Sequence, residues 1–133
     1  MKTPEHLKYL ASHQWGLREA DGSVTVGITD YAQSQLGDVV FVDLPAVGSS
    51  LEQARESGVI ESVKTASDLF APVSGTVIAI NPLLEDKPEI VNEAPYGEGW
   101  LFKIQPARLE AEWENLLDAD GYKAAVAAEQ DDD

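Results

Sequence analysis

Alternating apolar and polar positions run along most of the chain up to residue 106 and predict a mainly β protein. Residues 15–19 and 23–28 alternate on either side of Asp21-Gly22. This pair readily adopts the positive φ angles of a tight turn, so the two segments predict a β-hairpin. Further strands are expected over residues 38–44, 58–64, 76–80 and 100–104.

A helical pattern occurs twice: once between the predicted strands, near residues 30–36, and again beyond residue 107. A short helix is expected near residues 30–36, where Asp30 and Gln33 resemble a capping box and Gly37 closes the segment. Beyond residue 107, apolar side chains recur at helical spacing and predict C-terminal helices with one apolar face. These side chains are Leu109, Trp113, Leu116 and Leu117.

The end of the chain completes a single predicted domain over residues 1–133. Asp120 is expected to cap a second C-terminal helix over residues 122–129. Residues 130–133, Q-D-D-D, are expected to form a frayed acidic tail. A chain of 133 residues is long enough for one hydrophobic core.

Lys64 separates two apolar, β-prone runs near the middle of the chain. The runs consist of Val59, Ile60 and Val63 before the lysine, and Leu69, Phe70 and Val73 after it. Residues 65–68 between them are polar and form a short link, so the segment predicts a hairpin with Lys64 at its tip. A lysine held there is free of the core and suits covalent attachment of a long group.

The sequence around Lys64 does not favour a catalytic amine. A catalytic lysine must lose its proton near neutral pH, which requires burial or neighbouring cations. Glu61 and Asp68 are instead close in sequence, and nearby anions favour the charged form of an amine. Lys64 is therefore either an ordinary solvated lysine or one that a separate enzyme acylates from an activated donor.

Charge and cysteine content narrow the function further. Twenty-four acidic residues against nine basic ones give a net charge of −15, which argues against partners such as nucleic acids and anionic membranes. The chain has no cysteine, so its own side chains form no disulfide, thiolate metal site or dithiol. Any thiol chemistry must therefore be brought by a cofactor.

Several spaced motifs occur in order along nearly the whole chain. They are S-H-Q-W (12–15), V-G-I-T-D-Y-A (26–32), L-G-D-V-V-F-V-D-L-P (36–45), E-S-V-K (61–64) with S-D (67–68) and P-V-S-G (72–75), N-P-L-L (81–84) and P-Y-G-E-G-W-L (95–101). Together they resemble the glycine cleavage system H proteins, a family of lipoyl carriers. The resemblance implies a flattened β-barrel or barrel-sandwich hybrid of lipoyl-domain type. A weak internal repeat, residues 40–45 against 77–82, fits such a fold.

The resemblance also implies a function, a cofactor and partners. Lys64 would carry lipoic acid in amide linkage, attached by a lipoate ligase or lipoyltransferase. The arm would take an aminomethyl group from glycine decarboxylase (P protein) to aminomethyltransferase (T protein). Dihydrolipoamide dehydrogenase (L protein) would then reoxidise the dithiol. The chain would be a non-catalytic carrier in glycine catabolism and one-carbon metabolism.

Four further residues receive roles from this resemblance. Glu61 and Asp68 are interpreted as recognition residues for the modifying enzyme, with simple solvation of the hairpin as the alternative. Gln14 and Tyr31 stand where family members commonly carry an acidic residue and a histidine that line the cleft for the loaded arm. Both are neutral at pH 7, so we expect the arm to be sheltered here by neutral hydrogen bonds and apolar contacts.

Other reactive side chains give weak patterns. His6 and His13 have no ligand spacing typical of a metal site. Ser12 and Ser67 have no histidine in a nucleophile pattern, and residues 97–99 are a turn and not a phosphate loop. The tryptophans are interpreted as core or rim residues: Trp15, Trp100 and Trp113.

Three alternatives remain open at this point. One is a biotin-bearing or 2-oxo-acid dehydrogenase lipoyl domain, although V-K-T differs from the M-K-M or D-K-A typical of those families. Another is a lipoate-relay protein of H-protein type, and the third is an unmodified β-barrel interaction module. The N-terminus resembles neither a signal nor a transit peptide, so a bacterial cytoplasm is expected, or a mitochondrial matrix for a processed organellar chain.

Overall fold

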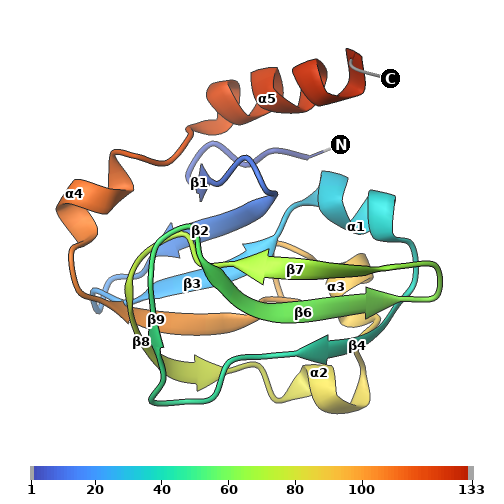
Figure 1. The fold of residues 1–133 in the computed structure, drawn as a ribbon, viewed down its shortest axis with the longest axis horizontal. Helices are drawn as coiled ribbons and strands as arrows, with labels where there is room; N and C mark the ends of the chain where they lie inside the picture. The colour runs from blue at the N-terminus through green and yellow to red at the C-terminus, as the bar shows by residue number, and fades with distance from the viewer. Residues whose placement is uncertain (1, 132–133) are drawn as a thin grey trace.

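The fold consists of two packed antiparallel sheets with helices at their margins (Figure 1). The structure, a computed structural model, describes residues 2–131. Within them the strands are β1 (Lys8–Tyr9), β2 (Gln14–Arg18), β3 (Val24–Ile28), β4 (Val39–Asp43), β5 (Ser50–Leu51), β6 (Glu56–Ser62), β7 (Ala66–Phe70), β8 (Gly75–Ile80) and β9 (Phe102–Pro106). The helices are α1 (Asp30–Leu36), α2 (Leu83–Asp86), α3 (Ile90–Glu93), α4 (Leu109–Trp113) and α5 (Ala119–Asp131).

One sheet is large and the other small. The six-stranded sheet has the order β1-β2-β3-β9-β8-β5, and the three-stranded sheet has the order β4-β6-β7. The predicted first hairpin is β2–β3, with Trp15 opposite Gly27 and Leu17 opposite Thr25. The mainly β prediction, with a helix near residues 30–36 and C-terminal helices, is confirmed, and the sheets pack as a sandwich and not as a closed barrel.

The main core fills the space between the two sheets. Its strand residues come from both layers and include Val26, Ile60, Leu69, Phe102 and Ile104. Each is at most 1% exposed. Full burial of one such side chain stabilises the fold by about 1.5–3 kcal/mol relative to leaving it in water. This core fixes β6 and β7 in front of β3 and β9 (Figure 1).

A second cluster attaches α5 and the N-terminal segment to the first hairpin. Tyr9 and Tyr122 stack with ring centroids 4.6 Å apart, and Trp15 and Val126 belong to the same cluster. Tyr9 also exchanges backbone hydrogen bonds of 2.8 Å with Leu117. Strand β1 was not predicted, because two residues are too short to show a period of two.

Both predicted helix N-caps are wrong, whereas Gly37 ends α1 as predicted. Thr29 caps α1, because its Oγ1 accepts the backbone N–H of Ala32 at 3.1 Å; Asp30 is the first helical residue, and its carboxylate binds Gln33 Nε2 at 2.8 Å. In α5, the N–H of Gly121 donates to Asp118 Oδ1 at 2.7 Å, and Asp120 lies inside the helix.

Three other boundaries differ from prediction. Strand β9 begins two residues later than expected, at Phe102, and it includes Pro106, which pairs with Gly75 at the end of the ladder. The long segment between β8 and β9 contains the short helices α2 and α3. Helix α5 continues through Asp131, two residues into the predicted tail, and residues 132–133 lie outside the described part.

Candidate functional site

The hairpin formed by β6 and β7 carries Lys64 at its tip, as the sequence predicted. The last pair of the ladder is Glu61 opposite Ala66, and beyond it Ser62 N–H donates to Thr65 O at 2.7 Å. The predicted polar link over residues 65–68 is wrong, because 66–68 pair with β6 and continue the strand. The connection is therefore tighter than expected, and Lys64 lies in the turn itself.

The tip is attached to the end of α1. The N–H of Val63 donates to Asp38 O at 3.0 Å, which joins the turn to the chain that follows the helix. Gly37 ends α1 with φ = 76°, and a Cβ added there would lie 3.2 Å from Lys64 Cε. The absence of a side chain at position 37 thus leaves room for the lysine stem. Lys64 itself is exposed, and within residues 2–131 it has no ion-pair partner.

Glu61 and Asp68 lie on one face of this hairpin. Directly paired residues of an antiparallel ladder project to the same face, and so do residues two apart in a strand. Glu61 is opposite Ala66 and Asp68 is opposite Val59, so the two carboxylates share a face, one on each strand. Both side chains are exposed, which leaves them accessible to another protein.

A cavity of about 320 Å³ opens beside the hairpin, and we call it the arm cleft. One wall is the start of β7 with Thr65, another is the open end of the β2–β3 hairpin with the two residues before it, and a third is α1. Its lining joins apolar and polar side chains: Ser12, His13, Gln14, Ile28, Tyr31, Ala32, Gln35, Leu36, Ile60, Thr65, Ala66, Ser67, Asp68, Leu69 and Glu129. The cleft therefore begins next to Lys64.

Gln14 and Tyr31 both line the arm cleft, so the structure brings these two predicted residues together with the hairpin. They are 3% and 8% exposed, respectively. Gln14 Oε1 accepts the hydroxyl of Ser12 at 2.5 Å. Gln14 Nε2 makes no hydrogen bond within residues 2–131, which leaves its two N–H donors for a molecule in the cleft.

The lining includes charged side chains beside neutral and apolar ones, so shelter of the arm by neutral hydrogen bonds and apolar contacts stays a prediction. Asp68 and Glu129 contribute carboxylates, and no lysine or arginine is among the described residues that line the cleft. Glu129 lies in α5, more than a hundred residues further along the sequence than the lining residues at the β2–β3 hairpin. No local sequence pattern could assign it to the site.

His13 connects Glu129 to the buried cluster under α5. Its Nδ1 lies 2.7 Å from Tyr122 Oη, and its Nε2 lies 3.2 Å from both carboxylate oxygens of Glu129. Tyr122 Oη is also 2.7 Å from Thr29 Oγ1. Burial raises the pKa of the Tyr122 phenol well above its usual range, so the hydroxyl stays protonated. When His13 carries its hydrogen on Nε2, each donor in this row of hydrogen bonds, from Thr29 through Tyr122 and His13 to Glu129, faces an acceptor.

The remaining candidates lie elsewhere. His6 is exposed and outside the cleft, and residues 2–131 contain no group of three or more potential metal ligands. Trp15 is a core residue whose Nε1 donates to Ile28 O at 2.9 Å and Pro95 O at 3.0 Å. Trp100 and Trp113 lie at the rim, under Lys103 and Arg18 respectively.

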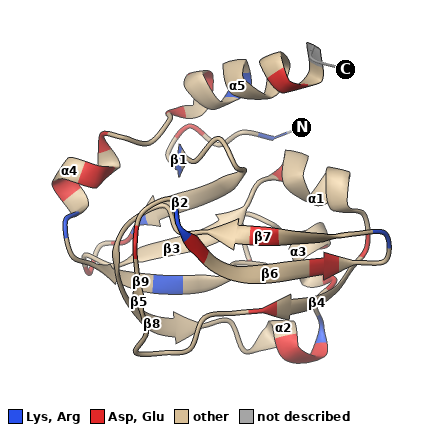
Figure 2. Ribbon diagram, viewed as in Figure 1, with Lys and Arg blue, Asp and Glu red and all other residues tan. Residues whose placement is uncertain are grey.

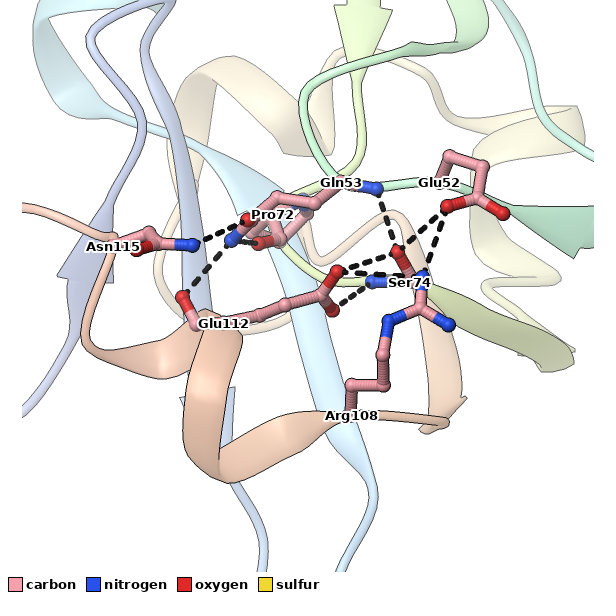
Figure 3. A network of polar contacts seen from close by, with 7 residues as sticks. All are labelled: Glu52, Gln53, Pro72, Ser74, Arg108, Glu112 and Asn115. Atoms are coloured by element: carbon pink, nitrogen blue, oxygen red, sulfur yellow. Dashed lines mark hydrogen bonds and ion pairs between the residues drawn. The ribbon is translucent and has the colours of Figure 1, made fainter.

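A second polar cluster, the α4 network, attaches α4 to the loops around β5 and β8 (Figure 3). At its centre Glu112, only 8% exposed, accepts the N–H and the hydroxyl of Ser74, each at 2.7 Å. Glu52, Gln53, Arg108 and Asn115 complete it. Its groups bond to one another, so the network stabilises the fold where α4 meets the sheets.

Acidic residues are distributed over helices and strands on the face drawn in Figure 2, without a basic stripe. This distribution fits the net charge of −15. Helices long and apolar enough to span a bilayer are absent from residues 2–131.

Comparison with known proteins gives one consistent family. The family model described as "Glycine cleavage H-protein" matches residues 7–129. The "Glycine cleavage system H protein" of Marinobacter nauticus is 57% identical over 127 residues, covering 96% of this chain and 97% of the relative. That of Shewanella loihica is 56% identical over 126 residues, covering 95% and 97%.

A solved structure supports the fold as well. The crystal structure of a glycine cleavage system H protein from Mycobacterium marinum superposes with a TM-score of 0.81 at 39% identity. The match covers 93% of this chain and 98% of that protein. The architecture of two packed sheets with a protruding hairpin is thus shared with a protein of that description.

Proposed function

We propose a lipoyl-carrier function for this chain, which belongs to the glycine cleavage H-protein family. In this proposal lipoic acid is joined through an amide bond to Nζ of Lys64. The lipoyl group supplies the disulfide chemistry that a chain without cysteine cannot supply itself. The observation that carries the proposal is the exposed position of Lys64 at a hairpin tip that opens into the arm cleft.

The surroundings of Lys64 fit such a group. Its Nζ has no ion-pair partner among residues 2–131, so a modifying enzyme can reach it without breaking a salt bridge. Acylation replaces a cation by a neutral amide at an exposed position, which leaves no buried group unpaired. The arm cleft offers apolar surface from Ala32 and Ala66 and amide donors from Gln14.

The chain then acts as a carrier, and we assign no bond-making step to its own side chains. Its hairpin presents the arm to glycine decarboxylase for loading with an aminomethyl group, to aminomethyltransferase for unloading, and to dihydrolipoamide dehydrogenase for reoxidation. A tethered group reaches each active site at a higher effective concentration than a free one. The relatives are bacterial proteins, which supports a bacterial cytoplasm as the place of action.

We also propose Glu61 and Asp68 as contacts for the lipoate ligase or lipoyltransferase. They are exposed, share one face of the hairpin and flank Lys64 in the sequence. A carboxylate on either strand gives a modifying enzyme two charges by which to orient the tip.

The experiment is the intact mass of the full chain produced in a lipoate-replete host, with Lys64→Arg as the matched variant. The wild-type chain should gain one lipoyl increment and the variant none. Exchange of labelled CO2 into glycine by glycine decarboxylase should then require the modified chain, which separates a cleavage carrier from a lipoate-relay protein. A wild-type mass without the increment would overturn the proposal.

A further inference from the structure

One asparagine side chain outside the hairpin connects the end of α1 to the start of β4. Asn92, on α3, donates from Nδ2 to Gly37 O at 2.7 Å and to Gln33 Oε1 at 3.2 Å. Its Oδ1 accepts the backbone N–H of Val39 at 2.9 Å. Both N–H donors and the oxygen of the amide are therefore used, and they hold the chain on either side of Asp38.

The peptide unit between Asp38 and Val39 is bonded on both of its edges. The carbonyl of Asp38 and the N–H of Val39 belong to one planar trans peptide and point in opposite directions. On one edge, the N–H of Val39 donates to Asn92. On the other edge, Asp38 O accepts the N–H of Val63 at 3.0 Å. The orientation that Asn92 gives to this unit is thus passed directly to the turn that carries Lys64.

The bond between Val63 and Asp38 joins the lysine turn to the rest of the fold. Within residues 2–131, the other hydrogen bonds of residues 63–65 stay inside the hairpin. Gly37, which Asn92 also holds, adjoins the stem of Lys64, because a Cβ at position 37 would lie 3.2 Å from Lys64 Cε. Asn92 therefore fixes both parts of the chain that the turn meets outside its own hairpin.

We propose that Asn92 is a positioning residue for the modification of Lys64: through the 38–39 peptide it holds the turn in the orientation that the modifying enzyme binds. The inference rests on the proposed carrier function. An enzyme that accepts one orientation of the turn binds the chain more weakly when fewer molecules present that orientation. Loss of the Asn92 amide should therefore raise KM for the chain and leave kcat unchanged.

Asn81 provides a matched comparison away from the hairpin. Its Nδ2 donates to Glu98 O and Trp100 O, each at 2.7 Å. Its Oδ1 accepts the N–H of Leu83 at 3.1 Å, so both asparagines donate twice and accept once. Asn81 is only 3% exposed, and its three bonds lie in the connection between β8 and β9. Its substitution should lower stability at least as much as that of Asn92 and leave the lysine turn unchanged.

The test follows acylation of the full, unmodified chain by a purified lipoate ligase, with the activated lipoyl donor in excess and the chain concentration varied. The KM for the chain should rise roughly three- to tenfold in Asn92→Ala, as for the loss of a hydrogen bond, while kcat stays the same. Asn92→Asp keeps an oxygen for the Val39 N–H but has no donor for Gly37 O, so its KM should lie between those of wild type and Asn92→Ala. Asn81→Ala should keep the wild-type KM.

Amide hydrogen exchange of Val63 reports on the turn itself. The Val63 N–H is protected while it is bonded to Asp38 O, so its exchange should be roughly three- to tenfold faster in Asn92→Ala. A merely structural loss of stability would not have this effect, because an exposed turn opens locally. Asn81→Ala should therefore keep the wild-type exchange rate at Val63.

The outcomes that overturn the inference differ from the one that overturns the carrier function. An unchanged KM or an unchanged Val63 exchange rate in the Asn92 variants overturns the positioning role, and so does an equal rise of KM in Asn81→Ala. Asn92→Asp decides these points alone if Asn92→Ala does not fold. Absence of acylation at Lys64 in the wild-type chain overturns the carrier function, and this inference with it.

Discussion

The hairpin tip and the α4 network are both polar clusters at turns, yet they are built in opposite ways. In the α4 network the oxygens of Glu112 accept two bonds of 2.7 Å from Ser74, and the carboxylate is buried. At the tip, the Ser62 hydroxyl accepts exposed N–H groups of Lys64 and Thr65 at 3.4 and 3.2 Å. Short, buried bonds to a carboxylate therefore join α4 to the sheets, whereas the Ser62 hydroxyl beside Lys64, the proposed attachment site, makes only long and exposed bonds.

Lys64→Arg has the largest expected effect: it should abolish the proposed function and leave the stability of the fold unchanged. Arginine keeps the exposed cation but cannot form the lipoyl amide, so acylation and glycine cleavage should be lost completely. The free energy of unfolding should change by no more than about 0.5 kcal/mol, as for an exposed substitution. Intact mass and urea unfolding measure the two effects.

The matched control for Lys64→Arg is Lys87→Arg, at another exposed lysine outside the hairpin. It should retain both the lipoyl increment and the activity. Unfolding of Lys64→Arg at markedly lower urea than wild type would mean that the tip is structural after all.

Glu112→Ala should have the opposite effect: it should lower the stability of the fold and leave acylation of Lys64 unchanged. It leaves the Ser74 N–H without its acceptor in a buried position and removes the closer of the two carboxylate partners of the Ser74 hydroxyl, the other being Glu52 at 3.2 Å. Loss of such charge-assisted bonds should lower the free energy of unfolding by about 2–4 kcal/mol. The variant that still folds should be lipoylated at Lys64 at the wild-type rate. Urea unfolding with intact mass tests both statements, and Glu114→Ala is the exposed control.

Asp68→Asn and Glu61→Gln change exposed strand positions beside the hairpin tip and test the proposed contacts with the modifying enzyme. If both carboxylates orient the modifying enzyme, the double substitution should slow acylation roughly tenfold, equivalent to about 1.4 kcal/mol of binding. The unfolding free energy should stay within about 0.5 kcal/mol of wild type. A time course of lipoylation with purified ligase measures the rate, and an unchanged rate would reduce the two residues to solvation of the hairpin.

The contrast between the two clusters also explains how far the sequence could lead. Local sequence signals sufficed to predict the β2–β3 hairpin, α1, and Lys64 at the tip of the β6–β7 hairpin. Each of these signals, such as the Asp21-Gly22 turn or the motif around the lysine, spans only a few neighbouring positions. The family resemblance brought Gln14 and Tyr31 to the same cleft, where both are found.

Other features depend on residues far apart in the sequence, and no local period reports them. Glu112 and Ser74 are 38 positions apart, and His13 and Glu129 are 116 apart. Glu112 stands among acidic neighbours that are exposed, so its burial cannot be told from its surroundings in the sequence. Strand β5 has two residues and shows no alternation. Tertiary packing alone decides these positions.

Ser62→Ala gives the smallest expected effect and sharpens the comparison most. The hydroxyl makes only long bonds: it accepts from Lys64 N–H at 3.4 Å and Thr65 N–H at 3.2 Å, and it donates to Thr65 O at 3.2 Å. All of these groups are exposed and can bond to water when the hydroxyl is removed. The unfolding free energy should therefore fall by about 0.5 kcal/mol or less, at the low end for a hydrogen bond. Lipoylation should continue, because the Ser62 N–H to Thr65 O bond of 2.7 Å still closes the turn. Urea unfolding and an acylation time course measure both, with Ser34→Ala in α1 as a serine control. A loss of stability as large as that of Glu112→Ala would show that the tip is as firmly built as the α4 network, and the division of labour between them would fail.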